Sequence, residues 1–149
     1  MMGYIEDIRG QVGNMPIILN ASAGVITNKR KELLLQKRVD TSNWSLPGGY
    51  LEYGESYLDA LYREVTEDCG FKAEDVKALG NFMDFVLYPN GDKAQVFCNL
   101  YLINSFSGNR ITTPTKETIT TAYFAFNNLP PLFNGQNRKM INFASTLFE

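Results

Sequence analysis

The chain has 149 residues, enough for one domain with a substantial core but too few for two ordinary ones. Its formal net charge is −2 and it contains no histidine, which excludes His-based nucleophilic catalysis and His-based zinc sites. With no basic excess, no long apolar run and two cysteines that suit a reduced core, we expect one cytoplasmic domain over residues 1–149. Neither a nucleic-acid polymer nor a membrane is an expected partner.

The N-terminal residues predict a short helix or arm. Apolar side chains in residues 4–12 recur at helical spacing, although two glycines weaken the pattern. The apolar positions are Ile5, Ile8 and Val12. Residues 1–14 are therefore expected to form a helix or arm that packs on the domain or on a second subunit.

Two strands and an irregular loop are predicted next. Residues 16–27 are rich in β-branched side chains and predict a strand, a polar turn follows at 28–31, and residues 32–39 are predicted as the return strand. The segment 40–56 contains Pro47 and three glycines, so we expect irregular backbone there.

Residues 56–69 predict a helix with an unusual distribution of charge. The expected N-cap and C-terminal residues are Ser56 and Gly70. The expected packing stripe consists of Leu58, Leu61, Tyr62, Val65 and Cys69. On another face, Glu64, Glu67 and Asp68 repel one another and crowd the C-terminal turns, where the helix dipole favours cations. This arrangement indicates a nearby cation, with a solvated acidic face as the alternative.

The second half of the chain predicts further strands and a C-terminal helix. Residues 72–77 are predicted as a charged linker before two apolar strands at 78–88 and 94–106, which a turn at Asn90-Gly91 joins. The remaining expected elements are a loop at 107–118, a strand at 121–126, a loop at 127–136 and a helix at 137–148. Helices that interrupt a mixed sheet predict an α+β fold or a three-layer sandwich.

The composition also limits the chemistry of the acidic helix. A glycine-rich loop before a helix can bind phosphate, but no Lys-Ser/Thr pair follows these glycines, so the loop departs from a P-loop. Oxygen ligands without His or Cys select Mg²⁺, Mn²⁺ or Ca²⁺. The resulting hypothesis is metal-assisted hydrolysis of a phosphate anhydride, in which the metal binds phosphate oxygens and lowers the pKa of an attacking water.

Residues 49–71 resemble the Nudix box, G-x5-E-x7-R-E-U-x-E-E-x-G-U, where U is a bulky apolar residue. The matching positions are Gly49, Glu55, Arg63, Glu64, Val65, Glu67, Gly70 and Phe71. The departure is Asp68, which stands where the pattern has the second Glu of a pair. Trp44 and Leu46-Pro47-Gly48 also resemble the usual lead-in to the box. The chain is thus similar to the Nudix hydrolases of MutT-like type.

The resemblance implies an α/β/α sandwich with a mixed β-sheet and a function in metal-dependent hydrolysis. The implied substrate is a nucleoside diphosphate linked to another group, cleaved at a phosphate anhydride, and the implied cofactor is Mg²⁺ or Mn²⁺. The implied metal ligands are Glu64, Glu67, Asp68 and the carbonyl of Gly48. Arg63 would orient a neighbouring carboxylate, and Glu55 would stabilise the junction between loop and helix. The alternative is a weakly catalytic or inactive Nudix-fold domain that senses nucleotides, and a homodimer is a further expectation.

Further candidates lie outside the box. Glu117 corresponds in place to a glutamate that acts in many family members as a base or an extra ligand, with an exposed loop acid as the alternative; the expected catalytic residues are therefore Glu67, Arg63 and Glu117. Arg38 is expected to bind a substrate phosphate. Trp44 and Tyr88 are expected to contact the substrate, although core packing is the favoured alternative for both aromatic side chains. The shorter side chain of Asp68 predicts reduced activity or an altered preference between Mg²⁺ and Mn²⁺.

Overall fold

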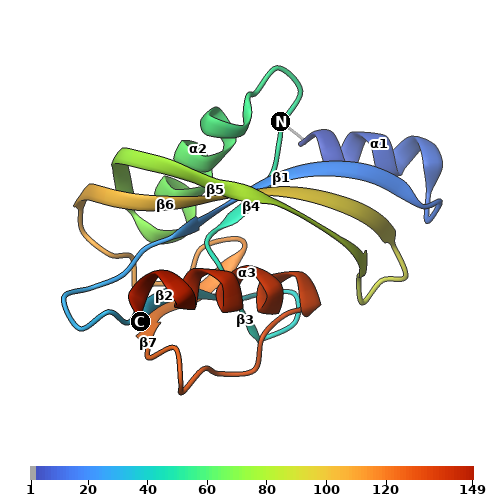
Figure 1. The fold of residues 1–149 in the computed structure, drawn as a ribbon. Coiled ribbons are helices and arrows are strands. Elements are labelled where there is room, and N and C mark those ends of the chain that lie inside the picture. Colours follow the sequence, from blue (N-terminus) through green and yellow to red (C-terminus); the bar gives the residue numbers. More distant parts are fainter. Residues whose placement is uncertain (1–2) are drawn as a thin grey trace.

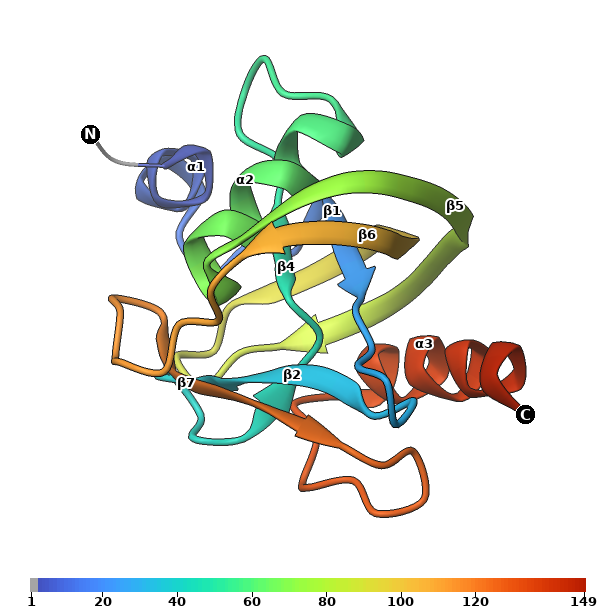
Figure 2. The same cartoon turned by 90° about the vertical axis from the view of Figure 1, so that its left-hand side faces the viewer.

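The computed structural model describes residues 3–149, which fold around two β-sheets (Figures 1 and 2). In the four-stranded sheet, of order β4-β1-β6-β5, β1 and β6 are parallel and the other pairs are antiparallel. Its strands are β1 (Ile17–Val25), β4 (Gly48–Tyr50), β5 (Phe71–Leu87) and β6 (Lys93–Gly108). The second sheet is antiparallel, in the order β3-β2-β7. Its strands are β2 (Leu33–Arg38), β3 (Trp44–Ser45) and β7 (Thr118–Phe124).

Within the described part of the chain, three helices pack against these sheets. They are α1 (Tyr4–Val12), α2 (Tyr57–Cys69) and α3 (Gly135–Ser145), and a 3-10 turn (Thr146–Phe148) follows α3. Figure 1 shows α2 on one side of the four-stranded sheet, with the three-stranded sheet and α3 on the other side. The predicted α+β sandwich with a mixed sheet is confirmed. No helix in residues 3–149 has the length and apolar character needed to cross a membrane.

Two hydrophobic clusters hold these layers together. One joins β1, β2 and β6 to α3, through side chains such as Leu33 and Ile141. The other joins α2 to neighbouring strands through Leu61 and Val65, neither of which is exposed. Each such side chain contributes roughly 1.5–3 kcal/mol to stability when fully buried. Both free cysteines are buried, as predicted.

Several strand predictions are wrong in detail. Residues 32–39 do not pair with the preceding strand in one sheet. Contact between the two segments is limited to the turn, at the isolated bridge Thr27–Leu33 and its adjoining hydrogen bonds, and β1 and β2 belong to different sheets. Apolar alternation identifies a strand and its buried face but carries no information on its partner. The supposed linker at 72–77 is the first part of β5, where all four charged side chains are exposed and the pairing with β6 is irregular. The loop at 40–56 contains the short strands β3 and β4, and β7 begins at Thr118 rather than at 121.

The turn and helix predictions agree better with the structure. The Asn90-Gly91 turn joins β5 to β6, and α1 covers residues 4–12 as expected. The C-terminal helix begins at Gly135, two positions before the predicted 137, after an Asn134 side chain that caps it. Ser56 caps α2 by exchanging two hydrogen bonds with Asp59, and Gly70 ends it in the left-handed conformation at φ 81°.

The buried face of α2 differs from the predicted stripe. Leu61, Val65 and Cys69 are buried, as predicted. Leu58 and Tyr62 are instead 40% and 39% exposed. Glu64 and Asp68 lie in the buried face instead, at 6% and 3% exposure. The alternative of a solvated acidic face is therefore wrong for these two acids, while Glu67 does lie in solvent.

Candidate active site

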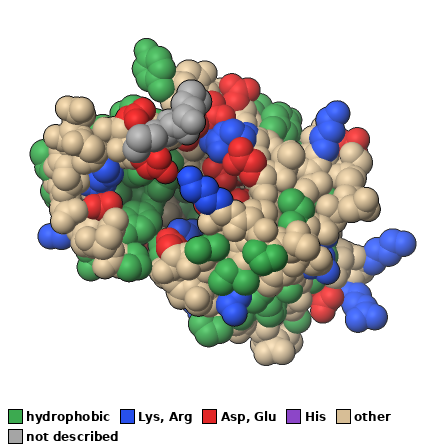
Figure 3. Space-filling model, turned by 180° about the vertical axis from the view of Figure 1, so that it is seen from behind, with side chains coloured by type: hydrophobic (Ala, Val, Ile, Leu, Met, Phe, Trp, Pro, Cys, Tyr) green, Lys and Arg blue, Asp and Glu red, His purple; other side chains and the backbone are tan. Residues whose placement is uncertain are grey.

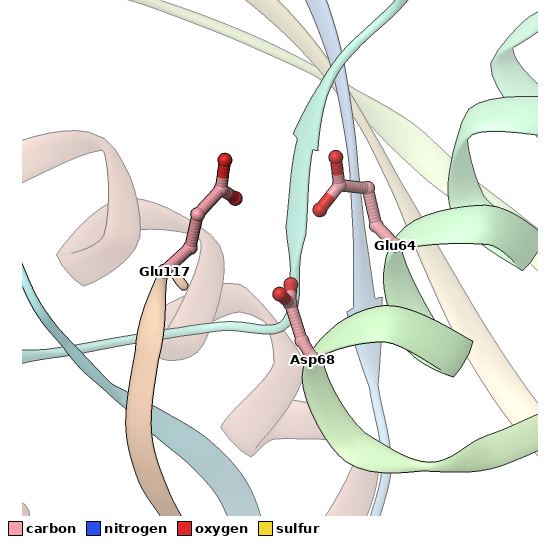
Figure 4. A group of neighbouring side chains, drawn as sticks. All are labelled: Glu64, Asp68 and Glu117. Atoms are coloured by element: carbon pink, nitrogen blue, oxygen red, sulfur yellow. The ribbon is translucent and has the colours of Figure 1, made fainter. Parts of the chain in front are cut away.

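Three carboxylates meet where α2 faces the start of β7 (Figure 4). Glu64 and Asp68 lie on one face of α2 because they are four residues apart. Glu117 is the residue immediately before β7, and Figure 4 shows its side chain pointing toward α2. One carboxylate oxygen from each of the three residues lies within 4.8 Å of the others. The fold thus unites two acids of the box with one that is 49 residues beyond Asp68 in sequence, from 68 to 117.

Arg63 fixes the positions of the acids around it. Its guanidinium donates to both carboxylate oxygens of Glu55, at 2.7 and 2.8 Å, and to Glu64 Oε1 at 2.7 Å. It also donates to the carbonyl of Tyr50 at 3.1 Å, and Glu67 Oε2 lies 3.4 Å away. The hydrogen bond with Glu55 is the main reason that the pKa of Arg63 is raised, so the group stays cationic. These contacts agree with the predicted orienting role of Arg63 and with the predicted place of Glu55 at the junction of loop and helix.

The buried acids are not fully compensated by this one arginine. Burial, followed by the charge of Asp68, raises the pKa of Glu64, although the ion pair with Arg63 opposes the shift. Burial, followed by the charge of Glu117, raises the pKa of Asp68, to which the Gly48 N–H donates over a long 3.4 Å. Buried carboxylates without full compensation are unfavourable, so the group favours the binding of a cation.

Two glycines of β4 allow the backbone to approach these acids closely. A Cβ atom on Gly49 would lie 2.5 Å from Glu64 Oε1, so a side chain there would displace the carboxylate. A Cβ on Gly48 would overlap the carbonyl of Ser22 in the neighbouring strand β1. The Gly48 N–H points to Asp68, while the predicted role of its carbonyl as a metal ligand stays a prediction.

A cavity of about 690 Å³ opens beside the carboxylates. Figure 3 shows a hollow with hydrophobic side chains next to a group of acidic and basic ones. Glu64, Glu67 and Glu117 line the cavity, whereas Asp68 is not a lining residue. The aromatic and apolar lining includes Tyr50, Val86, Tyr88, Val96, Phe133 and Met140.

The structure brings two of the three predicted substrate-binding residues to this cavity. Arg38 and Tyr88 both line it. The Arg38 guanidinium stacks 3.8 Å above the ring centroid of Phe133 and donates to both oxygens of Asp40, at 2.9 and 2.8 Å. Trp44 is not a lining residue, because its ring packs edge-on against Phe124 and belongs to the core. This placement favours the packing alternative for Trp44.

Two buried polar residues next to Asp68 escaped the sequence analysis. The Thr118 hydroxyl donates to Gln36 Oε1 at 2.6 Å and lies 3.4 Å from Asp68 Oδ1. Gln36 also donates to the carbonyl of Leu46, over 3.4 Å. The one available signal was that Gln36 directly follows three apolar residues in a strand, where a polar side chain is unexpected.

Comparison with protein families decides the relationship of this domain. A family model described as "NUDIX domain" matches residues 19–143, which include all three clustered carboxylates. The chain belongs to the NUDIX family. The resemblance of residues 49–71 to the family's box is thereby confirmed, and the match begins only after α1.

Individual relatives agree with this assignment. The chain is 41% identical over 68 residues to an RNA pyrophosphohydrolase of Ruthia magnifica subsp. Calyptogena magnifica, a stretch that covers 46% of this chain and 38% of that protein. The crystal structure of a MutT NUDIX hydrolase from Burkholderia pseudomallei superposes with a TM-score of 0.72 at 23% identity, over 84% of this chain and 96% of that one. A MutT protein from Methanosarcina mazei Go1 gives a TM-score of 0.71 at 17% identity, over 91% and 99% of the two chains. At these identities the two structures show a shared fold.

Proposed function

We propose that this NUDIX protein is a divalent-metal-dependent pyrophosphohydrolase. Its substrate is a nucleoside diphosphate linked to another group, and it cleaves a phosphate anhydride. The observation that carries the proposal is the group formed by Glu64, Asp68 and Glu117, two of them buried, at the side of a cavity of about 690 Å³. A cavity of this size is in the range of small-molecule sites, about 300–1,000 Å³.

The residues of the group fit Mg²⁺ or Mn²⁺. They supply oxygen atoms alone, and two oxygens bound to one Mg²⁺ lie at most about 4.2 Å apart. The carboxylate oxygens of the group lie within 4.8 Å of one another, so small side-chain movements would bring them to the distances that one ion requires. Glu64, Asp68 and Glu117 would hold the ion, with Glu67 and the Gly48 carbonyl as further predicted ligands. A bound ion neutralises charge that develops on phosphate oxygens and lowers the pKa of the attacking water.

The protein's own side chains divide the remaining work. Arg63 keeps Glu64 in the orientation that the site needs, through a 2.7 Å hydrogen bond. Glu67 lies outside the group of three acids and is accessible from the cavity, so its carboxylate can accept the proton of the attacking water. Glu117 is the second candidate base, since it is exposed and lines the same cavity. Arg38 lines the cavity as a donor for a substrate phosphate.

The test is hydrolysis of a substrate panel with Mg²⁺ or Mn²⁺, followed by chromatography of the products. The panel contains an oxidised nucleoside triphosphate, ADP-ribose, a sugar nucleotide and a dinucleoside polyphosphate. We expect turnover of at least one compound, its loss after chelation, and its loss in Glu67→Gln. Glu74→Gln is the matched control, because Glu74 is an exposed acid on β5 outside the cavity lining.

Two outcomes point elsewhere. Binding of a nucleotide without turnover, with Glu67→Gln behaving as the wild type, would support the alternative of a nucleotide-sensing domain. Hydrolysis of RNA bearing a 5′-triphosphate, added because one relative is an RNA pyrophosphohydrolase, would replace the small nucleotide as substrate. The homodimer and the cytoplasmic location stay predictions.

A further inference from the structure

Helix α1 contributes to the cavity although it lies outside the family match. Ile5 and Glu6 line the cavity of about 690 Å³, whereas the match begins at residue 19. No residue of α1 is fully buried, and Ile5, Ile8 and Val12 only pack partly against the core. The helix is therefore positioned to shape the cavity without being a main part of the hydrophobic core.

A second pocket, of about 220 Å³, adjoins the cavity beneath α1. It shares Ile5, Asp40, Tyr50 and Tyr88 with the cavity and includes none of the three clustered carboxylates. The rings of Tyr50 and Tyr88 meet edge-on with their centroids 6.5 Å apart, and Ile5 and Leu19 add aliphatic sides. The acceptor groups around this pocket belong to Asp40, Asn90 and Asp92. Each of these acceptors already takes a hydrogen bond within the protein, so it is the aromatic and aliphatic sides that suit the pocket to a planar aromatic group.

The one basic group of this pocket is already used within the protein. Arg9 donates to the carbonyls of Gly13, Met15 and Lys93, at 3.0, 2.6 and 2.6 Å, and pairs with Asp92 at 3.5 Å. Its donors therefore hold the C-terminal end of α1 and the β5–β6 turn in place. A phosphate in this pocket would meet two carboxylates and an arginine whose three guanidinium nitrogens already contact protein acceptors, so the pocket disfavours phosphate.

The other end of α1 is connected to the acidic site. The Tyr4 N–H donates to Glu52 Oε2 at 2.7 Å, and the Glu52 N–H donates to Glu55 Oε1 at 2.7 Å. Glu55 in turn holds Arg63, which contacts Glu64. The start of the helix is thus fixed relative to the candidate metal ligands, and its end is fixed relative to the second pocket.

We propose that α1 forms one wall of the pocket that receives the planar aromatic group of the substrate, and that Ile5 limits the size of that group. This inference rests on the proposed function, since it takes the substrate to be a nucleotide. With a divalent cation bound, the acidic site would hold the diphosphate, and the base lies between Ile5 and the two tyrosines. Ile5 is then a specificity-determining residue supplied by an element beyond the shared domain.

The experiment measures dissociation constants by calorimetry in Mg²⁺ for GDP, CDP and inorganic pyrophosphate. Ile5→Trp fills the pocket, so we expect it to weaken GDP binding by about tenfold or more, to weaken CDP binding less, and to leave pyrophosphate binding unchanged. Ile5→Ala widens the pocket and is expected to reduce the ratio between the GDP and CDP constants. Ile8→Ala is the matched control, because Ile8 is one turn further on the same helix and lines neither the cavity nor the pocket. We expect wild-type constants for it.

The outcomes separate this inference from the proposed function. Unchanged GDP binding in Ile5→Trp together with an unchanged GDP/CDP ratio in Ile5→Ala overturns the inference, as does equal weakening of GDP and pyrophosphate. An equal effect of Ile8→Ala overturns it as well. Failure of the wild type to hydrolyse any nucleotide, while GDP binding still depends on Ile5, contradicts the proposed function and leaves the pocket assignment supported.

Discussion

Helices α2 and α3 both bury polar side chains beside the cavity, but they satisfy them in opposite ways. In α3, Asn137 accepts a hydrogen bond from the Leu46 N–H at 2.9 Å and donates to Asn134 at 2.8 Å. Gln136 donates to two backbone carbonyls of the four-stranded sheet, at 2.9 and 3.0 Å. These amides are neutral, and they join the helix to loop and strand segments that would otherwise leave polar backbone groups unpaired.

In α2 the buried groups are acids that face another acid. Glu64 and Asp68 lie near Glu117, and Arg63 is the one basic side chain in residues 3–149 that forms an ion pair with any of the three. This difference distinguishes a buried polar residue that supports the fold, called here a framework residue, from one that belongs to a binding site. A buried polar group with matched neutral partners stabilises the fold, whereas buried like charges indicate that a cation completes the structure.

The largest expected effect comes from Glu64→Gln, which makes the α2 site resemble the α3 framework. We expect kcat/KM with Mg²⁺ to fall by more than about 100-fold, because loss of an outer partner of a metal ligand alone lowers activity about 10–100-fold. The melting temperature of the metal-free protein is not expected to fall, since burial already disfavours the charged form of Glu64 by raising its pKa, and Gln keeps a hydrogen-bond acceptor for Arg63. Steady-state kinetics and thermal unfolding measure the two, with Glu74→Gln as the control. Full activity in Glu64→Gln would contradict the assignment of Glu64 to a metal site and leave α2 with only a structural role, like α3.

Asn137→Leu makes the opposite change in α3. It leaves the buried Leu46 N–H without an acceptor, so the free energy of unfolding is expected to fall by about 1–3 kcal/mol. Mg²⁺ affinity is expected to stay close to that of the wild type, because the hydrogen bonds of the Asn137 side chain go to Leu46 and Asn134 and not to the three acids. Urea denaturation and calorimetry measure the two quantities. A stability equal to that of the wild type, or a large loss of Mg²⁺ affinity, would contradict the framework role.

The pH dependence of stability separates the helices without mutation. The pKa values of Glu64 and Asp68 are raised in the folded protein, so their contribution to stability is complete below the ordinary carboxyl pKa, about 4. It is lost as the pH rises through the raised values, toward about pH 9. The metal-free protein should therefore melt at a lower temperature near pH 9 than near pH 5. The difference should be about 2–4 °C for each kcal/mol by which the free energy of unfolding decreases. Excess Mg²⁺ should reduce this difference, as should Glu64→Gln, whereas Asn137→Leu should leave the slope unchanged. A flat profile without metal would contradict the assignment of uncompensated acids.

The sequence predicted the chemistry of α2 better than its packing. The unfavourable position of Glu64, Glu67 and Asp68 was visible from their spacing and from the helix dipole. Which of them turns inward depends on the direction from which the strands cover the helix, and residue spacing within α2 carries no information about that. Glu117 was found through its resemblance in position, because a contact across 49 residues leaves no local pattern.

Strand partners and the buried side-chain hydrogen bonds were harder to predict, because both depend on contacts between residues distant in sequence. The apolar run in 32–39 marked a strand, but pairing with β7 rather than β1 is decided by long-range contacts. The charged residues at 72–77 concealed the start of β5, since an edge strand can expose many of its side chains. The framework amides of α3 and the Thr118–Gln36 hydrogen bond likewise depend on partners that are distant in sequence.

The smallest expected effect belongs to Asp68→Glu, which restores the usual residue of the box while keeping its charge. Asp68 is buried between the Gly48 N–H and the Thr118 hydroxyl, each at 3.4 Å, so an added methylene moves the carboxylate toward the other acids. A bound metal can shift to follow the carboxylate, so we expect a change smaller than the roughly 100-fold loss that a misplacement of about 1 Å can cause, seen as a shift in the ratio of rates with Mg²⁺ and Mn²⁺. Thr118→Val provides the matched test, since it removes the hydroxyl and keeps the shape of the side chain. If Asp68 is set by its surroundings, Thr118→Val should alter the same ratio, whereas an unchanged ratio in both variants would show that the shorter acid is of no consequence for the metal.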